Sequence, residues 1–182
     1  MMDFMELAKT RQSTRKFDGR AVERDLLDKC TSAARIAPSA CNSQPWKFII
    51  VDEPELVKKV AECTYGGVVR FNKFTDDAAA FAVVVIEPGT FASSAGAAFT
   101  NLDYAMIDMG MAVENFCLQA AELGIGTCIL GWSRHPAIGS LLEIPKDKRL
   151  GLLIAIGYEK DRKIRPKVRK PFEEICSYNK YL

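Results

Sequence analysis

Arg11-Gln-Ser-Thr-Arg-Lys-Phe17 is the stretch around which the rest of the chain can be organised. Side chains alternate between two sides of an extended backbone, so Arg11, Ser13 and Arg15 would project together. Two cations and a hydroxyl on one side suit a phosphate on a small ligand, because Arg offers a planar fork of donors to phosphate oxygens. Taken alone, however, the stretch is more typical of basic residues that complement the C-terminal dipole of a preceding helix in solvent.

The length and composition indicate one soluble domain. The chain has 182 residues, 48% hydrophobic and 26% charged, which are ordinary values for a globular protein. No apolar run approaches the ~18 residues that span a bilayer, and the N-terminus does not resemble a signal peptide. The net charge of +2 is too small to indicate nucleic-acid binding. We expect a cytoplasmic protein, a single domain over residues 1–182, that binds neither nucleic acid nor membrane.

Positive charge is concentrated near the C-terminus, where residues 160–170 contain seven Lys and Arg against one Asp. Such a segment is usually a solvated face. Lys167 and Arg169 nevertheless repeat the alternation of Arg11 and Arg15, so stretches from opposite ends of the chain could converge on one phosphate. The sequence alone does not decide between these readings.

Hydrophobic periodicity predicts four strands and about five helices in one α/β or α+β domain. We expect helices over residues 3–10, 23–37, 54–63 and 136–142, and a longer one that begins at Asn101 or Asp103 and continues to about residue 123. Strands are expected over 47–51, 81–86, 127–131 and 150–156, and a flexible loop over 90–98. The helix over 103–123 is apolar around most of its circumference, which indicates burial in a core or at a subunit interface. The apolar tail 171–182 should pack on its own domain or on a partner subunit, and the long helix favours the partner.

The loop Pro38-Ser-Ala-Cys-Asn-Ser-Gln-Pro-Trp46 has the most unusual composition in the chain. It is a solvated surface loop or, equally well on this evidence, part of a small-molecule site, because such sites are often built from polar loops at the mouth of a sheet. Cys41 within it is more typical of a small loop residue than of a reactive thiol, although the reactive role stays open.

Other chemical motifs are weak or missing. The six cysteines form no Cys-x-x-Cys pair and are expected to be free thiols, and His135 is the only histidine. Zinc, other metal and Ser-His-Asp sites are therefore unsupported. His135 precedes a proline and fits a helix start better than a catalytic role. Glycines 124, 126 and 131 follow a helix, which is the wrong order for a dinucleotide fingerprint.

Four motifs together resemble the nitroreductase family of FMN-dependent oxidoreductases. They are Arg11-x-Ser-x-Arg15-x-Phe17, Pro38-Ser-Ala-x-Asn-x-Gln-Pro-Trp46, Leu130-Gly131-Trp132 and Arg169-Lys-Pro171. The likeness runs in order from about residue 4 to residue 175. It implies an α+β fold with three α/β/α layers, a mostly antiparallel central sheet and an intertwined homodimer. The extension 160–182 would pack on the partner subunit.

The resemblance also implies an FMN site at the dimer interface. By motif position, Arg11 and Ser13 would hold the phosphate and ribityl end, and Arg15 would approach the pyrimidine edge of the flavin. Lys167 and Arg169 would close on the phosphate.

The other expected cofactor contacts come from two further places. Leu130 and Gly131 would bring backbone N–H groups toward flavin N5. The polar loop would contribute Pro38, Ser39, Ala40 and Asn42 from the partner subunit. We expect Gln44, in the same motif, to bind the cofactor as well.

The implied chemistry is hydride transfer from NAD(P)H to flavin N5 and then to a nitroaromatic, quinone or related small acceptor, by a ping-pong mechanism. No catalytic side chain is required, since the cofactor carries the reaction. Relatives with the same fold that cleave flavin, remove halogen or reduce activated alkenes are the nearest alternative. A flavin-storage or sensing protein without turnover is the alternative from a different class.

Two departures from the family pattern concern the substrate side of the site. The family often has an Asn followed three residues later by Lys, touching the flavin, whereas here Asn72 is followed at once by Lys73. Residues 87–100 also replace a larger helical excursion that usually roofs the substrate. We therefore expect an open active site, with the loop 90–98 as its lid.

Overall fold

A four-stranded antiparallel sheet forms the centre of the computed structural model, which describes residues 3–66, 70–161 and 163–181. The strands are β1 (Trp46–Val51), β2 (Ala80–Ile86), β3 (Gly126–Leu130) and β4 (Arg149–Gly157). Their order is β1-β2-β4-β3, and every neighbouring pair is antiparallel. The expected sheet is confirmed, and β3 lies at one edge of it.

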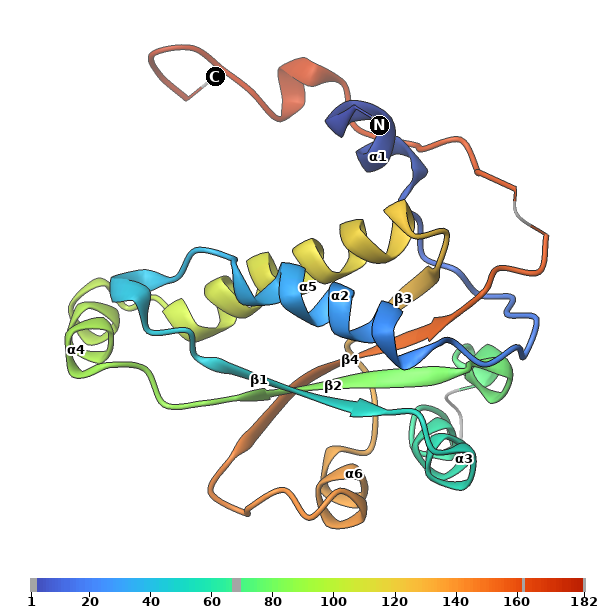
Figure 1. Cartoon of the computed structure of the whole chain (residues 1–182). Coiled ribbons are helices and arrows are strands. Elements are labelled where there is room, and N and C mark those ends of the chain that lie inside the picture. Colours follow the sequence, from blue (N-terminus) through green and yellow to red (C-terminus); the bar gives the residue numbers. More distant parts are fainter. Residues whose placement is uncertain (1–2, 67–69, 162, 182) are drawn as a thin grey trace.

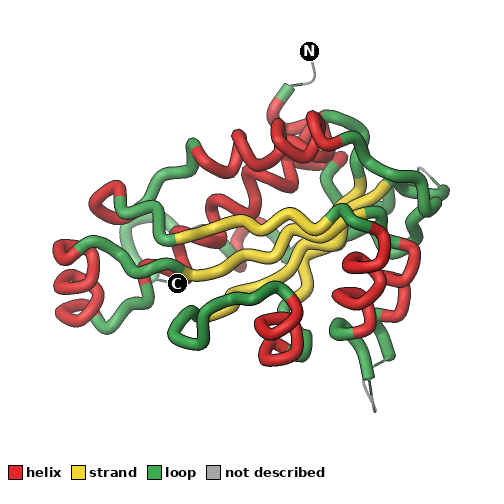
Figure 2. Tube along the Cα trace, turned by 60° about the horizontal axis from the view of Figure 1, so that its bottom comes forward, coloured by secondary structure: helices red, strands yellow, loops and turns green. Residues whose placement is uncertain are grey.

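Helices cover both faces of the sheet, which gives three layers (Figures 1 and 2). The α-helices of the described residues are α1 (Phe4–Thr10), α2 (Arg24–Arg35), α3 (Pro54–Glu62), α4 (Phe91–Thr100), α5 (Tyr104–Glu122) and α6 (His135–Leu141). Helices α2 and α5 pack together on one face, and α3 and α6 lie on the other. The expected α+β fold with three layers is therefore confirmed.

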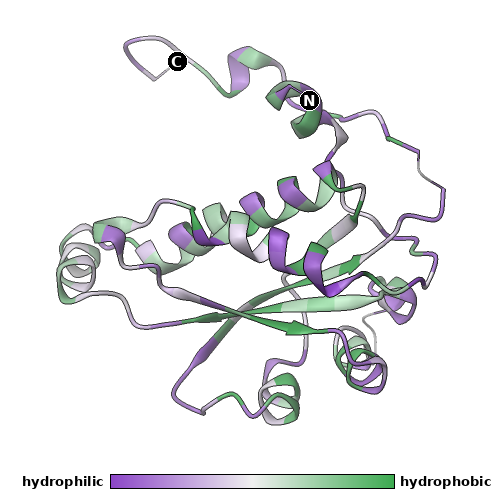
Figure 3. Ribbon diagram, in the orientation of Figure 1, coloured by the Kyte–Doolittle hydropathy of each residue, from purple (hydrophilic) through white to green (hydrophobic). Residues whose placement is uncertain are grey.

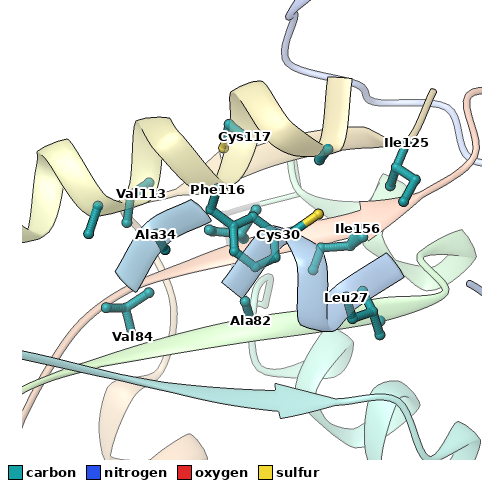
Figure 4. Packing of buried hydrophobic residues seen from close by; sticks show 14 of the residues in the cluster. Leu27, Cys30, Ala34, Ala82, Val84, Val113, Phe116, Cys117, Ile125 and Ile156 are labelled. Carbon is teal, nitrogen blue, oxygen red and sulfur yellow. The ribbon is translucent and has the colours of Figure 1, made fainter. Parts of the chain in front are cut away.

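Alternation along the central strand β2 explains why both faces are covered. Ala82 and Val84 pack with Phe116 of α5 (Figure 4), whereas Phe81 and Val83 belong to the hydrophobic cluster on the opposite face. Successive side chains of a strand point to opposite faces, so a strand that is apolar at every position must be buried on both. Figure 3 shows the hydrophobic colour concentrated in the strands.

Helix α5 is apolar nearly all round, but the chain buries only one of its faces. Met109, Ala112 and Phe116 are buried against the sheet side, whereas Ile107 is 50% exposed and Met111, one turn later, is 36% exposed. The expected burial is thus met on one side only. An apolar helical face that the described residues leave uncovered fits the alternative of a subunit interface.

The expectation of a flexible loop over residues 90–98 is wrong, because this segment is helix α4. Thr90 is its N-cap and its hydroxyl accepts a hydrogen bond from the Ser93 N–H at 3.2 Å. Asn101 ends the helix in the left-handed conformation, with φ of 56°. The serines and the glycine suggested a loop, but the alanines between them favour a helix once both ends are capped.

The C-terminal segment extends away from the sheet (Figure 1), and its Lys167 contacts the Arg11 carbonyl at the end of α1. It contains one short 3-10 turn, Phe172–Glu174. Most of its large apolar side chains are exposed, namely Ile164, Val168, Phe172, Ile175, Tyr178 and Tyr181. Arg162 of the basic segment and Leu182 at the end of the tail lie outside the described residues. None of the helices within the described ranges has the length and apolarity to cross a membrane.

Candidate functional site

The stretch 11–17 is extended and lies beside the edge strand β3. Ser13 forms a parallel bridge with Thr127, and the Thr14 N–H donates to the Thr127 carbonyl at 2.8 Å. Further on, Phe17 bridges Glu159 in the antiparallel sense. Thr14 and Phe17 are buried, and these two anchors hold the residues between them in a fixed conformation.

Arg11, Ser13 and Arg15 line one cavity of about 260 Å³, together with Lys167 and Arg169. We call this cavity the basic pocket; its full lining is Arg11, Gln12, Ser13, Arg15, Arg165, Pro166, Lys167, Val168 and Arg169. Arg11, Ser13 and Arg15 thus share one cavity, as the alternation predicts, but Gln12 lines it as well; Thr14 is buried. Basic residues from the two ends of the chain converge there.

The basic pocket carries excess positive charge. Burial lowers the pKa of Lys167, and the charges of Arg11, Arg169 and Arg165 lower it further, while Glu114 acts in the opposite direction. The Lys167 ammonium donates to the Arg11 carbonyl, and Arg11 Nε lies 3.1 Å from Glu114 Oε1. One carboxylate does not neutralise this group of cations, so the pocket favours an anion with more than one charge, such as a phosphate.

Leu130 is the last residue of β3, three residues beyond Thr127, which is about 10 Å at the usual rise of a strand, and Gly131 follows it. Leu130 is buried, whereas Gly131 is exposed, and a Cβ built on it would meet no atom within 4 Å. Cys128 lies between Thr127 and Leu130 on the same strand. Burial raises the pKa of its thiol, and the nearby charge of Arg15 opposes that rise. Open space at Gly131 and cations near Ser13 therefore flank the same strand.

Asn72 holds the backbone that follows Gly131. It is buried, and its amide donates to the Thr64 carbonyl at 3.0 Å and to the Trp132 carbonyl at 3.5 Å. The Thr64 hydroxyl in turn lies 2.8 Å from that of Thr75. Lys73, by contrast, is exposed. Asn72 thus belongs to a buried polar network that supports the loop after β3.

The polar loop 38–46 is tightly built rather than merely solvated. Cys41, Asn42 and Gln44 all have positive φ values, between 46° and 52°. The Ala40 N–H donates to the buried carboxylate of Asp108 at 3.0 Å, and the Gln44 N–H donates to the Ser39 hydroxyl at 2.9 Å. Non-glycine residues adopt such backbone conformations only where their surroundings impose them.

The two regions do not meet within one chain. Helix α2 separates them along its whole length: the stretch 11–17 lies near its beginning and the polar loop 38–46 follows its end (Figure 1). The expected cofactor-binding residues therefore fall into two groups. Arg11, Ser13, Arg15, Lys167 and Arg169 share the basic pocket, whereas Leu130 ends the neighbouring strand and Gly131 follows it. Those of the polar loop, namely Pro38, Ser39, Ala40, Asn42 and Gln44, lie at the other end of the helical layer.

Arg165, Gln12 and Glu114 line or contact the basic pocket but were not among the predicted site residues. Arg165 lines it and its guanidinium donates to the Ser13 carbonyl. Gln12 contacts Arg165, and Glu114 pairs with Arg11. A signal existed for Arg165, because it continues the alternation of Lys167 and Arg169. No local pattern marks Gln12 or Glu114, whose contacts join residues more than 100 positions apart.

Four of the six cysteines are buried, and the histidine begins a helix. All six cysteines are free thiols, and Cys41 is exposed in the polar loop. Burial raises the pKa of Cys30 to about 12 and that of Cys117 to about 11, so neither is a thiolate at neutral pH. His135 starts helix α6, as expected, and burial lowers its pKa.

Comparisons with known proteins agree with this architecture. A protein of Archaeoglobus fulgidus, assigned by its name to the NADH dehydrogenase/NAD(P)H nitroreductase class, is 32% identical over 169 residues, covering 90% of this chain and 89% of its own. An oxygen-insensitive NADPH nitroreductase of Helicobacter acinonychis is 26% identical over 198 residues, with 91% of each chain covered. The solved structure of an FMN-dependent nitroreductase of Clostridium difficile superposes with a TM-score of 0.78, at 26% identity, over 98% of this chain and 100% of that one. The model of the nitroreductase family matches residues 8–158, and the chain belongs to this family.

Proposed function

We propose that this protein is an FMN-dependent oxidoreductase that passes electrons from NAD(P)H to small acceptors such as nitroaromatics or quinones. The observation that carries the proposal is the basic pocket, in which cations from both ends of the chain gather beside β3. The names of the relatives support the reductant, and the FMN-dependent structural neighbour supports the cofactor. We further propose a single domain over residues 1–182 in the cytoplasm, and a ping-pong order of substrates.

The described residues fit FMN at its charged end. A flavin phosphate carries close to two negative charges, and the excess of cations in the basic pocket calls for such an anion. Arg11 has its Nε committed to Glu114, which orients the rest of its guanidinium fork. We propose that Arg11, Lys167 and Arg169 hold the phosphate, and that Ser13 holds the ribityl end.

The flavin ring would lie farther along β3. Arg15 is the cation proposed for its pyrimidine edge, where positive charge stabilises a reduced, anionic flavin. Leu130 and Gly131 are proposed to offer backbone N–H groups to the opposite side, and the open space at Gly131 supports this role because a ring could approach the backbone closely. When bound, FMN supplies the acceptance of hydride and its release to the second substrate.

A second copy of the chain completes the proposed site. The contribution of Pro38, Ser39, Ala40, Asn42 and Gln44 requires a homodimer, because the polar loop is remote from the basic pocket of its own chain. The exposed apolar face of α5 supports such an interface, as do the exposed apolar side chains of residues 160–182. We propose that this extension packs on the partner subunit.

Purified protein tests the proposal directly. It should be yellow, and heat denaturation should release one FMN per chain, identified by its absorbance and by chromatography. Anaerobic mixing with NADH or NADPH in a stopped-flow instrument should then bleach the flavin on the timescale of turnover, and adding a nitroaromatic or quinone should restore the colour.

The possible outcomes separate the alternatives. Colourless protein that cannot be reconstituted with FMN overturns the proposed cofactor. Flavin that binds but is bleached by neither nucleotide favours storage, or a different reductant. Bleaching that only an activated alkene or a halogenated compound reverses favours the corresponding relatives with the same fold.

A further inference from the structure

Gln12 makes an unusual set of contacts for a residue between two predicted phosphate ligands. Its amide nitrogen donates to Glu159 Oε2 at 2.7 Å and to the Lys163 carbonyl at 2.9 Å. Its amide oxygen accepts from the Arg165 backbone N–H at 3.0 Å and from Arg165 Nε at 3.3 Å. An amide side chain has two donors and two acceptor sites, so Gln12 uses its full capacity.

These contacts hold a segment that has no regular structure of its own. Residues 163–169 form neither helix nor strand. Two backbone groups of the segment, at Lys163 and Arg165, are bound by the Gln12 side chain. Farther along, the Lys167 side chain donates to the Arg11 carbonyl. Among the described residues, Gln12 is therefore the side chain that fastens the backbone of this segment to the stretch 11–17.

Repulsion between cations opposes the docking of segment 163–169 on the stretch 11–17. The segment 163–169 brings Arg165, Lys167 and Arg169 beside Arg11, so its docking places like charges together. Repulsion among them opposes docking until an anion binds between the two basic stretches. A neutral amide adds no charge to this group, and it offsets part of the repulsion through hydrogen bonds.

We propose that Gln12 is a positioning residue, which fixes segment 163–169 so that Lys167 and Arg169 face the phosphate of the cofactor. This inference rests on the proposed function, in which FMN occupies the basic pocket. It assigns Gln12 no contact with the ring or with the reacting atoms.

The test compares Gln12→Ala with Gln119→Ala in the full chain. Gln119 is also a half-buried glutamine, but its amide donates to Glu122 within helix α5. The Kd for FMN and the Kd for riboflavin are measured by quenching of flavin fluorescence. Gln12→Ala should weaken FMN binding roughly tenfold and leave riboflavin binding unchanged, because riboflavin lacks the phosphate. Gln119→Ala should change neither. Equal losses for both flavins would indicate a general structural role and overturn the proposal.

A second measurement needs no flavin. Hydrogen–deuterium exchange of peptides covering 163–169 should be faster in Gln12→Ala than in wild type, and peptides from β2 should be unchanged. Unaltered exchange in 163–169 overturns the fastening role, whatever the flavin titrations give. A wild-type protein that binds no FMN overturns the proposed function, and the exchange result still reports on Gln12 separately.

Exchanging the side chains of Gln12 and Glu159 tests whether the affinity for FMN can be recovered. Gln12→Glu places a carboxylate beside Glu159, so it should weaken FMN binding at least as much as Gln12→Ala. The double variant Gln12→Glu with Glu159→Gln restores a donor and an acceptor at this contact, and should recover part of the affinity. A double variant no better than Gln12→Glu would count against the Gln12–Glu159 contact as the anchor.

Discussion

The stretch 11–17 and the polar loop 38–46 differ in where their partners come from. The first is fixed by its own chain, through the bridge from Ser13 to Thr127 and the buried Phe17. The second is shaped by its own chain, through Asp108 and Ser39, but faces none of the other predicted site residues. Under the proposed function, we therefore expect one chain to build the phosphate end of the FMN site, and a second copy to supply the polar loop at the ring end.

The largest expected effect comes from separating the two copies. Ile107→Asp places a charge on the exposed apolar face of α5, and burying it in an interface would raise the dimer dissociation constant roughly a hundredfold. Sedimentation at micromolar concentration should then give half the mass, and gel filtration should strip FMN from the protein. Ala137→Asp, on the exposed side of α6, is the matched control and should change neither. A dimer that keeps its flavin despite Ile107→Asp would contradict the proposal that this face of α5 forms the interface.

The next effect isolates the phosphate end. Arg11→Ala should raise the Kd for FMN roughly thirtyfold, because charge-assisted hydrogen bonds contribute ~2 kcal/mol. Lys16→Ala, in the same stretch but outside the basic pocket, should change it at most about twofold, since its exposed ion pair with Asp161 contributes little. Flavin fluorescence titrations measure both. Similar effects of the two substitutions would contradict the one-sided arrangement of this stretch.

A smaller effect is expected at the polar loop. Asp108→Ala removes the buried acceptor of the Ala40 N–H, and should lower the free energy of unfolding by about 1.5 kcal/mol. Urea denaturation followed by circular dichroism checks this, with the exposed Asp28→Ala as control. Hydrogen exchange should quicken in the loop 38–46 but not in 163–169. Faster exchange in both would mean that the two regions are coupled within one chain.

The smallest expected effect is on the pH dependence of stability and comes from His135, which lies outside both the stretch 11–17 and the polar loop. Burial lowers the pKa of His135 in the folded chain, so the unfolded chain takes up a proton first as the pH falls below ~6.5. Stability should therefore decline from that pH down to the lower folded pKa, and His135→Gln should remove this component. Paired urea titrations between pH ~5 and pH ~7.5 measure the difference. FMN binding should be unaffected, and a large loss of turnover would reopen a catalytic role for the histidine.

Most of the fold could be read from periodicity, because strands and helices bury their side chains at different spacings. The run 81–86 is apolar at every position and is indeed buried on both faces. The prediction of a loop over residues 90–98 is wrong because serine and glycine are common in loops, and because Thr90 and Asn101, which cap α4, have no apolar periodicity between them that marks a helix. Helix boundaries depend on such end contacts as much as on composition.

The candidate site was predictable only in part. Period two predicted that Arg11, Ser13 and Arg15 lie on one side, and the three do line one pocket, although Gln12 lines it too. The resemblance to the nitroreductase family added the remaining positions, whose roles toward FMN stay predictions. The positions of Gln12 and Glu114 at the pocket were not predicted, because their contacts are with residues far away in the sequence and no local pattern marks them.

The antiparallel sheet was an implication of the resemblance to the nitroreductase family. What the sequence by itself determined was the four strands, most of the helices, the order of the family motifs and the position of the basic stretch near the N-terminus. Those features follow from order, spacing and hydrophobic alternation, which are local properties of the chain. Only the tertiary structure decided that the basic stretches from both ends share a pocket and that the polar loop lies away from it. Arg11 and Lys167 are 156 positions apart in the sequence. Their contact depends on how the sheet edge and the helical layer pack, and no neighbouring residues encode that geometry.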